Sequence, residues 1–464
     1  MINFYNGLIY LGIYMYKSLG VLFRALESKI RDSFKRTDEF AENRSNISSS
    51  NYTAGVVNNL IGGNFFTGLL LLMNADDSFM GLVAMVGFIG NLLQVLSPLL
   101  LERFQSRKTL LIVSRAVIYF FNIVIISVIP FMGITNGIKL MLILVVILLV
   151  NLINAITASG FSVWHIRSIP ENVRVNYFSF FTVTNGVIIY TVIFAFSGIA
   201  DYFKISGNEM AGLYIIRVVA LLLCIVDIFF LYKIKEYPNL SSGTNMNIIN
   251  ILLNPFKEKK YLITVFIACL WNFSANIPGP YFTVYMLKDL GVSYSYLNII
   301  NMINIPILIF LTPLWRKRIS STSWFKTLCF SMGLFLFNYI ALSFVTKSTL
   351  VLYPIALIFS FLIAPGINLV FSNIPFINIP DKDQTNYIGF FSSMNNLAAL
   401  LGVLTGKEFI QHTEGITMSI LGIEMQNKQY ILLLTAVAML FAVILIYIMQ
   451  RRSDKIAHTV NQEN

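Results

Sequence analysis

The sequence predicts an all-α membrane protein built from two six-helix bundles. Its composition, its regular apolar segments and an internal repeat lead to this fold class. Of the 464 residues, 56% are hydrophobic and only 12% are charged, and the mean hydropathy is +0.73. A soluble domain carries roughly 25% charged residues, so this chain cannot cover its surface with polar groups in water. Lipid offers backbone N–H and C=O groups no partner, so each spanning segment is expected to be helical.

Twelve apolar segments, each near the length of about 20 residues that a spanning helix needs, follow one another along the chain. We place them near residues 53–73, 79–100, 109–131, 139–163, 177–199, 211–233, 261–285, 295–314, 327–346, 350–371, 386–406 and 429–449. The predicted domains are an N-terminal extension at 1–50, a six-helix bundle at 51–233, a central cytoplasmic linker at 234–260, a second bundle at 261–450 and a cytoplasmic tail at 451–464.

The extension, residues 1–50, does not follow the regular pattern. Its apolar run from Gly7 to Tyr16 is too short to span a bilayer, and its first residues lack the Lys or Arg of a secretory signal. We expect an interfacial amphipathic helix here, followed by a polar linker through Ser50. An additional transmembrane helix is the alternative.

A short internal repeat supports the division into two halves. Ile169–Asn185 returns as Ile379–Asn395 at a fixed offset of 210, with seven of seventeen positions identical. The identical pairs are Ile169/Ile379, Pro170/Pro380, Asn176/Asn386, Tyr177/Tyr387, Phe180/Phe390, Phe181/Phe391 and Asn185/Asn395. In each half the match is a polar loop that begins a long apolar segment. Duplicated halves are typical of polytopic transporters.

Charge fixes the expected orientation. The formal net charge of +11 does not indicate nucleic-acid binding, because Lys and Arg sit at the ends of apolar segments. They gather in the loops from even to odd spans, in the central linker and after the last span, which places both termini in the cytoplasm. Frequent Ile, Asn, Lys, Tyr and Phe, which have AT-rich codons, suggest a low-GC bacterium. We therefore expect a multi-pass protein of a bacterial cytoplasmic membrane.

The loop between the second and third spans reads Pro98-Leu-Leu-Leu-Glu-Arg-Phe-Gln-Ser-Arg-Lys108. It resembles the loop motif of the major facilitator superfamily, Gly-x-x-x-Asp-Arg-x-Gly-Arg-Arg/Lys, with Glu102 and Arg103 in the Asp-Arg places. Pro98 and Gln105 replace the glycines, and the basic end comes one residue later. A fainter copy, Pro313–Arg318, lies in the second half. The resemblance covers roughly residues 53–450 and implies two six-helix bundles related by a pseudo-two-fold axis along the membrane normal.

The resemblance also implies a conformational latch. Glu102 is expected to accept hydrogen bonds from backbone N–H groups at the start of the eleventh span, where the helix dipole favours negative charge. Arg103 and Arg107 are expected to pair with acids such as Glu171 or Asp381. These contacts would hold the cytoplasmic side closed and break when the halves rock. The alternative is that all five are solvated anchoring charges.

Polar residues near mid-depth are the candidates for substrate binding, because transporter sites lie between the halves. Trp271 is a candidate for stacking on a ring, and Asn64 and Asn276 fall in corresponding places of the two halves. Pro278 and Pro280 are expected to interrupt the seventh span. The alternative for any single Asn is a hydrogen bond between helices. The candidates are Asn64, Asn151, Asn154, Asn185, Tyr190, Trp271, Asn272, Asn276, Asn304, Asn395 and Asn396.

Few charges lie inside the spans. Asp227 is the clearest acidic one and is a possible proton-coupling site, or a carboxylate paired near the cytoplasmic face. Arg115 and Arg217 are expected to snorkel toward helix ends. The fourth-span Arg and fifth-span Gly-Pro motif of proton-coupled drug exporters do not occur, which argues against proton antiport.

The chain shows no ATP-binding Gly-rich loop, no catalytic Ser/His/Asp set and no metal-binding cluster of His and Cys, so we predict neither an enzyme nor a cofactor. We predict a monomeric secondary transporter that moves a small molecule by alternating access. Efflux of an amphipathic compound is slightly favoured, because the cavity is expected to be rich in Phe, Met and Asn. Uptake of a sugar or peptide-like solute is one alternative. A non-transporting membrane sensor or immunity protein is the other.

Overall fold

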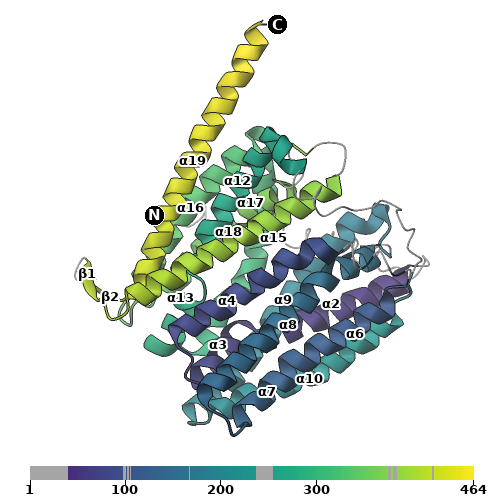
Figure 1. The fold of residues 1–464 in the computed structure, drawn as a ribbon, viewed down its shortest axis with the longest axis vertical. Helices are drawn as coiled ribbons and strands as arrows, with labels where there is room; N and C mark the ends of the chain where they lie inside the picture. Colours follow the sequence, from purple (N-terminus) through teal and green to yellow (C-terminus); the bar gives the residue numbers. More distant parts are fainter. Residues whose placement is uncertain are drawn as a thin grey trace, which may run out of the picture.

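The computed structural model describes residues 40–97, 101, 104, 106–166, 168–236, 254–374, 378–379, 384–420 and 423–463. Within these ranges the chain is helical apart from loops and one hairpin, Met418–Ile420 (β1) paired with Ile423–Met425 (β2), as Figure 1 shows. The predicted all-α membrane fold is confirmed, with the hairpin added to the last loop. The predicted interfacial helix and most of the central linker lie outside the described residues.

The N-terminal half follows the order of the predicted spans. Its first span is a broken helix, Ala41–Ile61 (α2) and Gly63–Leu72 (α3). The second is Asp77–Leu92 (α4) with the 3-10 turn Leu93–Leu96 (η1). The third joins Lys108–Tyr119 (α6), the π-helical Phe120–Ile125 (η2), Ile126–Val128 (α7) and Ile129–Phe131 (η3). Asn136–Ile166 (α8), Glu171–Ile205 (α9) and Glu209–Lys233 (α10) complete the half.

The C-terminal half also has six units. A 3-10 turn, Asn254–Lys257 (η4), precedes the seventh span, which joins Lys259–Asn276 (α12), Tyr281–Val284 (α13) and Tyr285–Asp289 (η5). Its break between α12 and α13 falls at Pro278 and Pro280, as predicted. The eighth span joins Tyr294–Ile299 (α14), Ile300–Ile303 (η6) and Asn304–Ser321 (α15). Trp324–Ser343 (α16), Leu352–Asn373 (α17), Gln384–His412 (α18) and Asn427–Glu463 (α19) follow.

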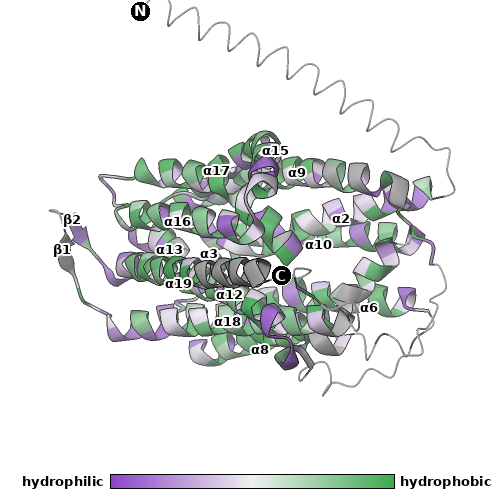
Figure 2. Cartoon of the chain, turned by 90° about the horizontal axis from the view of Figure 1, so that it is seen from above, coloured by the Kyte–Doolittle hydropathy of each residue, from purple (hydrophilic) through white to green (hydrophobic). Residues whose placement is uncertain are grey.

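The helices have the length and apolarity of membrane spans. Within the described residues, eleven are long and apolar enough to cross a bilayer, and the shorter α4 takes the place of the second predicted span. Hydrophobic positions run along most of each helix, with hydrophilic positions mainly toward the ends (Figure 2). The chain is therefore a multi-pass membrane protein.

The two largest differences from the predicted helix boundaries lie in the first and the last span. The first helix begins at Ala41 rather than near residue 53, because its polar side chains are buried against other helices rather than exposed. Asn43, Arg44, Ser48 and Ser50 are each at most 3% exposed. The last helix continues to Glu463, beyond the predicted end at 449, and projects past the other helices (Figure 1).

Helix packing differs between the halves. In the N-terminal half α2 packs against α10 and α9, and in the C-terminal half α12 packs against α18. The contact between α12 and α18 is close. A Cβ atom at Gly402 would overlap the carbonyl oxygen of Phe273, and one at Gly406 would overlap that of Ile277. Small residues let backbones approach in this way in membrane proteins.

Candidate functional site

A cavity of about 670 Å³ lies in the N-terminal half. Its walls come from α2, α8 and α9, with one residue from α6, and lie toward the end of the half at which α2 begins. The lining residues are Ile47, Asn51, Ala54, Gly55, Asn58, Arg115, Phe161, Ser162, Val163, His165, Ile166, Ile169, Tyr177, Phe178, Phe181 and Asn185. Most of the wall is apolar or aromatic, with a few polar groups, as in sites for small molecules.

Three polar groups of this wall have unused hydrogen-bonding capacity. Arg115 Nε, His165 Nε2 and Asn185 Oδ1 are buried and have no hydrogen-bond partner within the described residues. The Arg115 guanidinium lies 4.4 Å from the ring centroid of Phe161. Buried polar groups usually have partners, so these three are candidates for ligand contacts.

Aromatic rings hold the opposite wall in place. Tyr177 is 2% exposed, and its hydroxyl lies 2.9 Å from Ser48 Oγ on α2. The ring of Phe181 stacks on Tyr52 at a centroid distance of 5.1 Å and lies 6.3 Å from Tyr177. These contacts join α9 to α2 and fix the cavity's shape.

Asp227 lies on α10 in the same half, outside the cavity wall. Its side chain is fully buried. Ser50 Oγ and the Tyr119 hydroxyl each donate a hydrogen bond to it at 2.5 Å. Among the described residues no ion pair of this carboxylate lies within 4 Å, and Arg115 is the cation that acts on it electrostatically. Both interpretations of Asp227, as a coupling site and as a paired carboxylate, therefore stay predictions.

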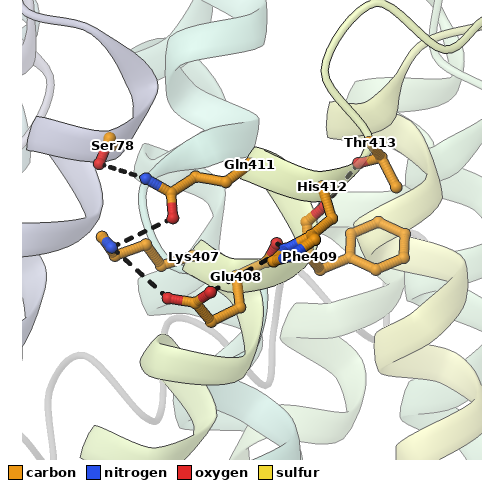
Figure 3. Close-up of polar contacts among 7 residues, drawn as sticks. All are labelled: Ser78, Lys407, Glu408, Phe409, Gln411, His412 and Thr413. Atoms are coloured by element: carbon orange, nitrogen blue, oxygen red, sulfur yellow. Dashed lines mark hydrogen bonds and ion pairs between the residues drawn. The ribbon is translucent and has the colours of Figure 1, made fainter.

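The opposite end of the molecule is closed by polar contacts between the halves. Figure 3 shows Gln411 of α18 pointing toward Ser78 of α4, with Nε2 donating to Oγ at 2.7 Å. Lys407 Nζ donates to Gln411 Oε1 at 3.2 Å and lies 3.6 Å from Glu408. These side chains join α18 to the first turn of α4.

A lysine on α19 adds an ion pair to this closure. Lys428 Nζ lies 3.1 Å from Asp77 of the N-terminal half and 2.9 Å from Asp289 of its own half. The Lys428 side chain is 7% exposed, whereas Asp77 is 26% and Asp289 21% exposed, so the lysine end of the ion pairs is the buried one.

The start of α14 meets α9 and α10 at the same end. Asp201 accepts hydrogen bonds from the backbone N–H groups of Tyr294 (2.7 Å) and Ser295 (2.8 Å), and the Tyr294 hydroxyl donates to Glu209 at 2.7 Å. A carboxylate at a helix N-terminus is favoured by the helix dipole. Together with the contacts of Ser78 and Lys428, these bonds define the sealed end.

The candidates of the N-terminal half have different surroundings. Asn185 lines the cavity. Asn64 belongs to the sealed end, because its Nδ2 donates to Asn298 Oδ1 at 3.0 Å, and Asn298 donates to Ser197 at 2.9 Å. Asn151 donates to its own helix at Ile147 and packs on Gly90 of α4. Asn154 is exposed on α8, and Tyr190 lies on α9, half-buried.

The candidates of the C-terminal half lie outside the cavity wall. Asn272 donates to Asn395 Oδ1 at 2.6 Å and so joins α12 to α18. Asn276 and Asn396 donate within their own helices, to Asn272 and Ser392. Trp271 packs against Phe335 and Phe371. Asn304 is the first residue of α15. For the Asn272–Asn395 pair the alternative interpretation, a hydrogen bond between helices, is the observed one.

The predicted latch falls largely outside the described residues, which do not include Glu102, Arg103 or Asp381; the backbone of Glu171 begins α9. Arg107 lies at the start of α6, where its Nε donates to Phe104 at 3.4 Å. A different acid, Glu236, accepts from the backbone N–H groups of Arg107 and Lys108 (3.0 Å for Lys108). A carboxylate thus caps the helix after this loop, but it comes from the same half.

Sequence reasoning missed most of the cavity's polar groups. Asn51 lies before residue 53, where the first span was expected to begin. Asn58 lies inside the predicted span but was not among the candidates, and Arg115 was expected to snorkel. Arg217 does not snorkel either. It is 4% exposed, its Nε donates to Ser127 Oγ at 2.7 Å, and its Nη2 donates to Asn122 O. One signal in the sequence could have shown that Arg115 faces inward. It lies one helical turn before Tyr119, so the two side chains share one face of the helix.

No protein-family model and no curated protein matches the sequence. Solved structures match its fold. The crystal structure of a point mutant of the nucleoside transporter NupG aligns with a TM-score of 0.67 at 14% identity, covering 88% of this chain and 99% of that chain. The structure titled nucleoside transporter NupG gives 0.63 at 12%, covering 88% and 98%. A D-xylose-proton symporter gives 0.63 at 13%, also covering 88% and 98%.

These neighbours are transporters of the major facilitator superfamily. The chain therefore has the fold of that superfamily, as its loop motif and repeat predicted.

Proposed function

We propose that the chain is a secondary transporter that takes up a small polar solute by alternating access. The observation that carries this proposal is the placement of the cavity toward one end of the bundle and of the described polar contacts between the halves at the other. A binding cavity that faces one side while the other side is closed is what alternating access requires. The neighbours named as a nucleoside transporter and a D-xylose-proton symporter support a transporter rather than an enzyme.

Uptake replaces efflux as the favoured direction. The efflux prediction rested on composition alone, and none of the neighbours' names supports it. A sensor without transport remains the competing function, because the loop motif is degenerate. We place the protein in a bacterial cytoplasmic membrane as a monomer, with the end at which α2 begins facing the cytoplasm, as the positive-inside bias favours.

The test is to lock the sealed end and measure uptake. Ser78→Cys and Gln411→Cys would be combined in a chain whose three native cysteines, Cys224, Cys269 and Cys329, are replaced by Ser. A short thiol crosslinker with a reducible bond should stop the uptake by cells of whichever labelled solute the wild type takes up, from a set of nucleosides, pentoses and small carboxylates, and a reductant should restore it. Each single-Cys chain is the control. Uptake that continues in the crosslinked protein would contradict alternating access.

Asp227 is our proposal for a proton-coupling residue. Its carboxylate is buried with two hydroxyl donors, and a protonated or ionised state can each be accommodated by rotation of those hydroxyls. Asp227→Asn should abolish proton-driven accumulation while leaving exchange of solute across the membrane. Accumulation at the wild-type level in this variant would exclude the role.

A further inference from the structure

Arg115 is a cation inside the third span whose Nε has no hydrogen-bond partner within the described residues. It is the eighth residue of α6, about 10 Å along the helix from Lys108. A cation at this depth in a membrane is costly unless it has partners. Its Nε is buried and donates to no acceptor among the described residues. A buried cation whose Nε has no acceptor in the described part of the chain is therefore a candidate for binding an anionic ligand.

The ring contact leaves the donor edge of Arg115 unused. The guanidinium carbon lies 4.4 Å from the ring centroid of Phe161 and 5.9 Å from that of Tyr119. Cation–π contact uses the attraction between the positive charge and the ring face, and offsets part of the desolvation. It satisfies none of the N–H groups, which form a planar fork that matches a carboxylate.

The charges around the cavity suit a single negative charge. Arg115 is the only Asp, Glu, Lys or Arg among the lining residues within the described part of the chain. The acid that acts on it electrostatically, Asp227, is fully buried and already accepts from Ser50 and Tyr119. A carboxylate would balance one guanidinium, whereas a doubly charged phosphate would leave a charge uncompensated in a wall that is mostly apolar.

The remaining walls define the rest of the ligand. Phe161, Phe178 and Phe181 offer ring faces and edges, and Asn185 Oδ1 and His165 Nε2 are the two other unsatisfied polar atoms. We propose that this cavity binds a small organic carboxylate with an aromatic or apolar body, anchored by Arg115. This inference rests on the proposed transporter function, for which it names the substrate class.

The test compares matched acids and amides on the purified full-length chain in lipid nanodiscs. Benzoate and phenylacetate should raise the melting temperature, and benzamide and phenylacetamide should not, because ligand bound to the folded state stabilises it. Arg115→Gln should weaken benzoate binding about tenfold or more, the range expected for a charge-assisted hydrogen bond. Arg115→Lys, which keeps the charge but lacks the fork, should fall between.

Arg318→Gln is the matched control. Arg318 also lies over a phenyl ring, 3.7 Å from the centroid of Phe330, but on α15 and outside the cavity wall. It should bind benzoate as the wild type does. Arg115→Gln also loses the ring contacts and the attraction to Asp227, so each variant's melting temperature with benzoate is compared with its own value without ligand. Equal stabilisation by benzamide, or unchanged benzoate binding in Arg115→Gln, would overturn the proposal.

Two further measurements distinguish a carboxylate from a phosphate ligand and from an anionic lipid. Stabilisation by phenyl phosphate but not by benzoate would overturn the carboxylate assignment. Benzoate binding that is lost in phosphatidylglycerol nanodiscs, yet kept in phosphatidylcholine, would assign the site to a lipid headgroup instead. Arg115-dependent benzoate binding without transport of labelled benzoate or any other solute would remove the transporter proposal and leave the carboxylate site standing. Solute uptake at the wild-type rate in Arg115→Gln would remove the carboxylate site and leave the transporter proposal standing.

Discussion

The two copies of the repeat place the same asparagine in opposite situations. Asn395 in the C-terminal copy accepts from Asn272 at 2.6 Å and joins α18 to α12. Asn185 in the N-terminal copy has an Oδ1 without a partner and lines the cavity. The sequence around both residues is similar, so the difference comes from the helix that each one faces.

Residues farther along the same helices explain this difference. Gly402 and Gly406 let α18 approach the backbone of α12. At the offset of 210, the N-terminal half has Val192 and Phe196 instead. α9 therefore has larger side chains at the places where the glycines of α18 admit the backbone of α12. The C-terminal half is therefore the tightly joined copy and the N-terminal half the one that carries a cavity.

The largest expected effect is that of Gly406→Ala. The added Cβ would overlap the carbonyl oxygen of Ile277, and a backbone atom cannot move aside cheaply. We expect a loss of about 3 kcal/mol in the free energy of unfolding, measured by denaturation in detergent. Gly198→Ala on α9, where nothing lies within 4 Å of the added Cβ, is the control and should change little. Equal effects of the two substitutions would mean that the close helix approach is not specific to one half.

The amide pair should contribute less. Asn272→Ala and Asn395→Ala should each destabilise the protein by about 1 kcal/mol, the usual size of a hydrogen bond between helices in a membrane. A double-mutant cycle should give a coupling free energy of similar size. Coupling near zero would show that the two amides contribute independently, and would remove the pair from the explanation of the tight half.

The smallest effect on stability is expected for Asn185→Ala. Its Oδ1 loses no partner, so the free energy of unfolding should change by about 0.5 kcal/mol or less. Solute uptake should still fall, mainly through a higher KM, because we propose that this amide contacts the solute. A destabilisation as large as that of Asn395→Ala would show that the two copies are alike after all.

The sequence predicted the fold better than it predicted the site. Lipid allows only helices, so apolar length located the spans, and Pro278 and Pro280 located the break in the seventh. The first helix was placed too late because a hydropathy pattern treats Asn43, Arg44 and Ser50 as exposed. Their partners are distant in sequence: Ser50 bonds to Asp227 on the sixth span.

Depth along a helix is also a poor guide to function. Asn64, Asn185 and Asn395 were equivalent candidates by depth, yet one belongs to the sealed end, one to the cavity and one to a helix pair. Arg115 was set aside because it lies nearer a helix end. Which face a side chain presents depends on helix rotation and on neighbours, and an apolar segment with hydrophobic residues all round carries little information about either.

The break in the first helix has a mechanical consequence. Gly62 separates α2 from α3, and Gly63, the first residue of α3, has a φ of +51°, a conformation that suits glycine. Asn51, Gly55 and Asn58, on one side of the break, border the cavity, whereas Asn64, on the other, holds the C-terminal half. The first span thus consists of two helical segments joined by one residue. A solute in the cavity that tilts α2 therefore acts on α3, and through it on the sealed end, by way of the one residue that joins the two helices.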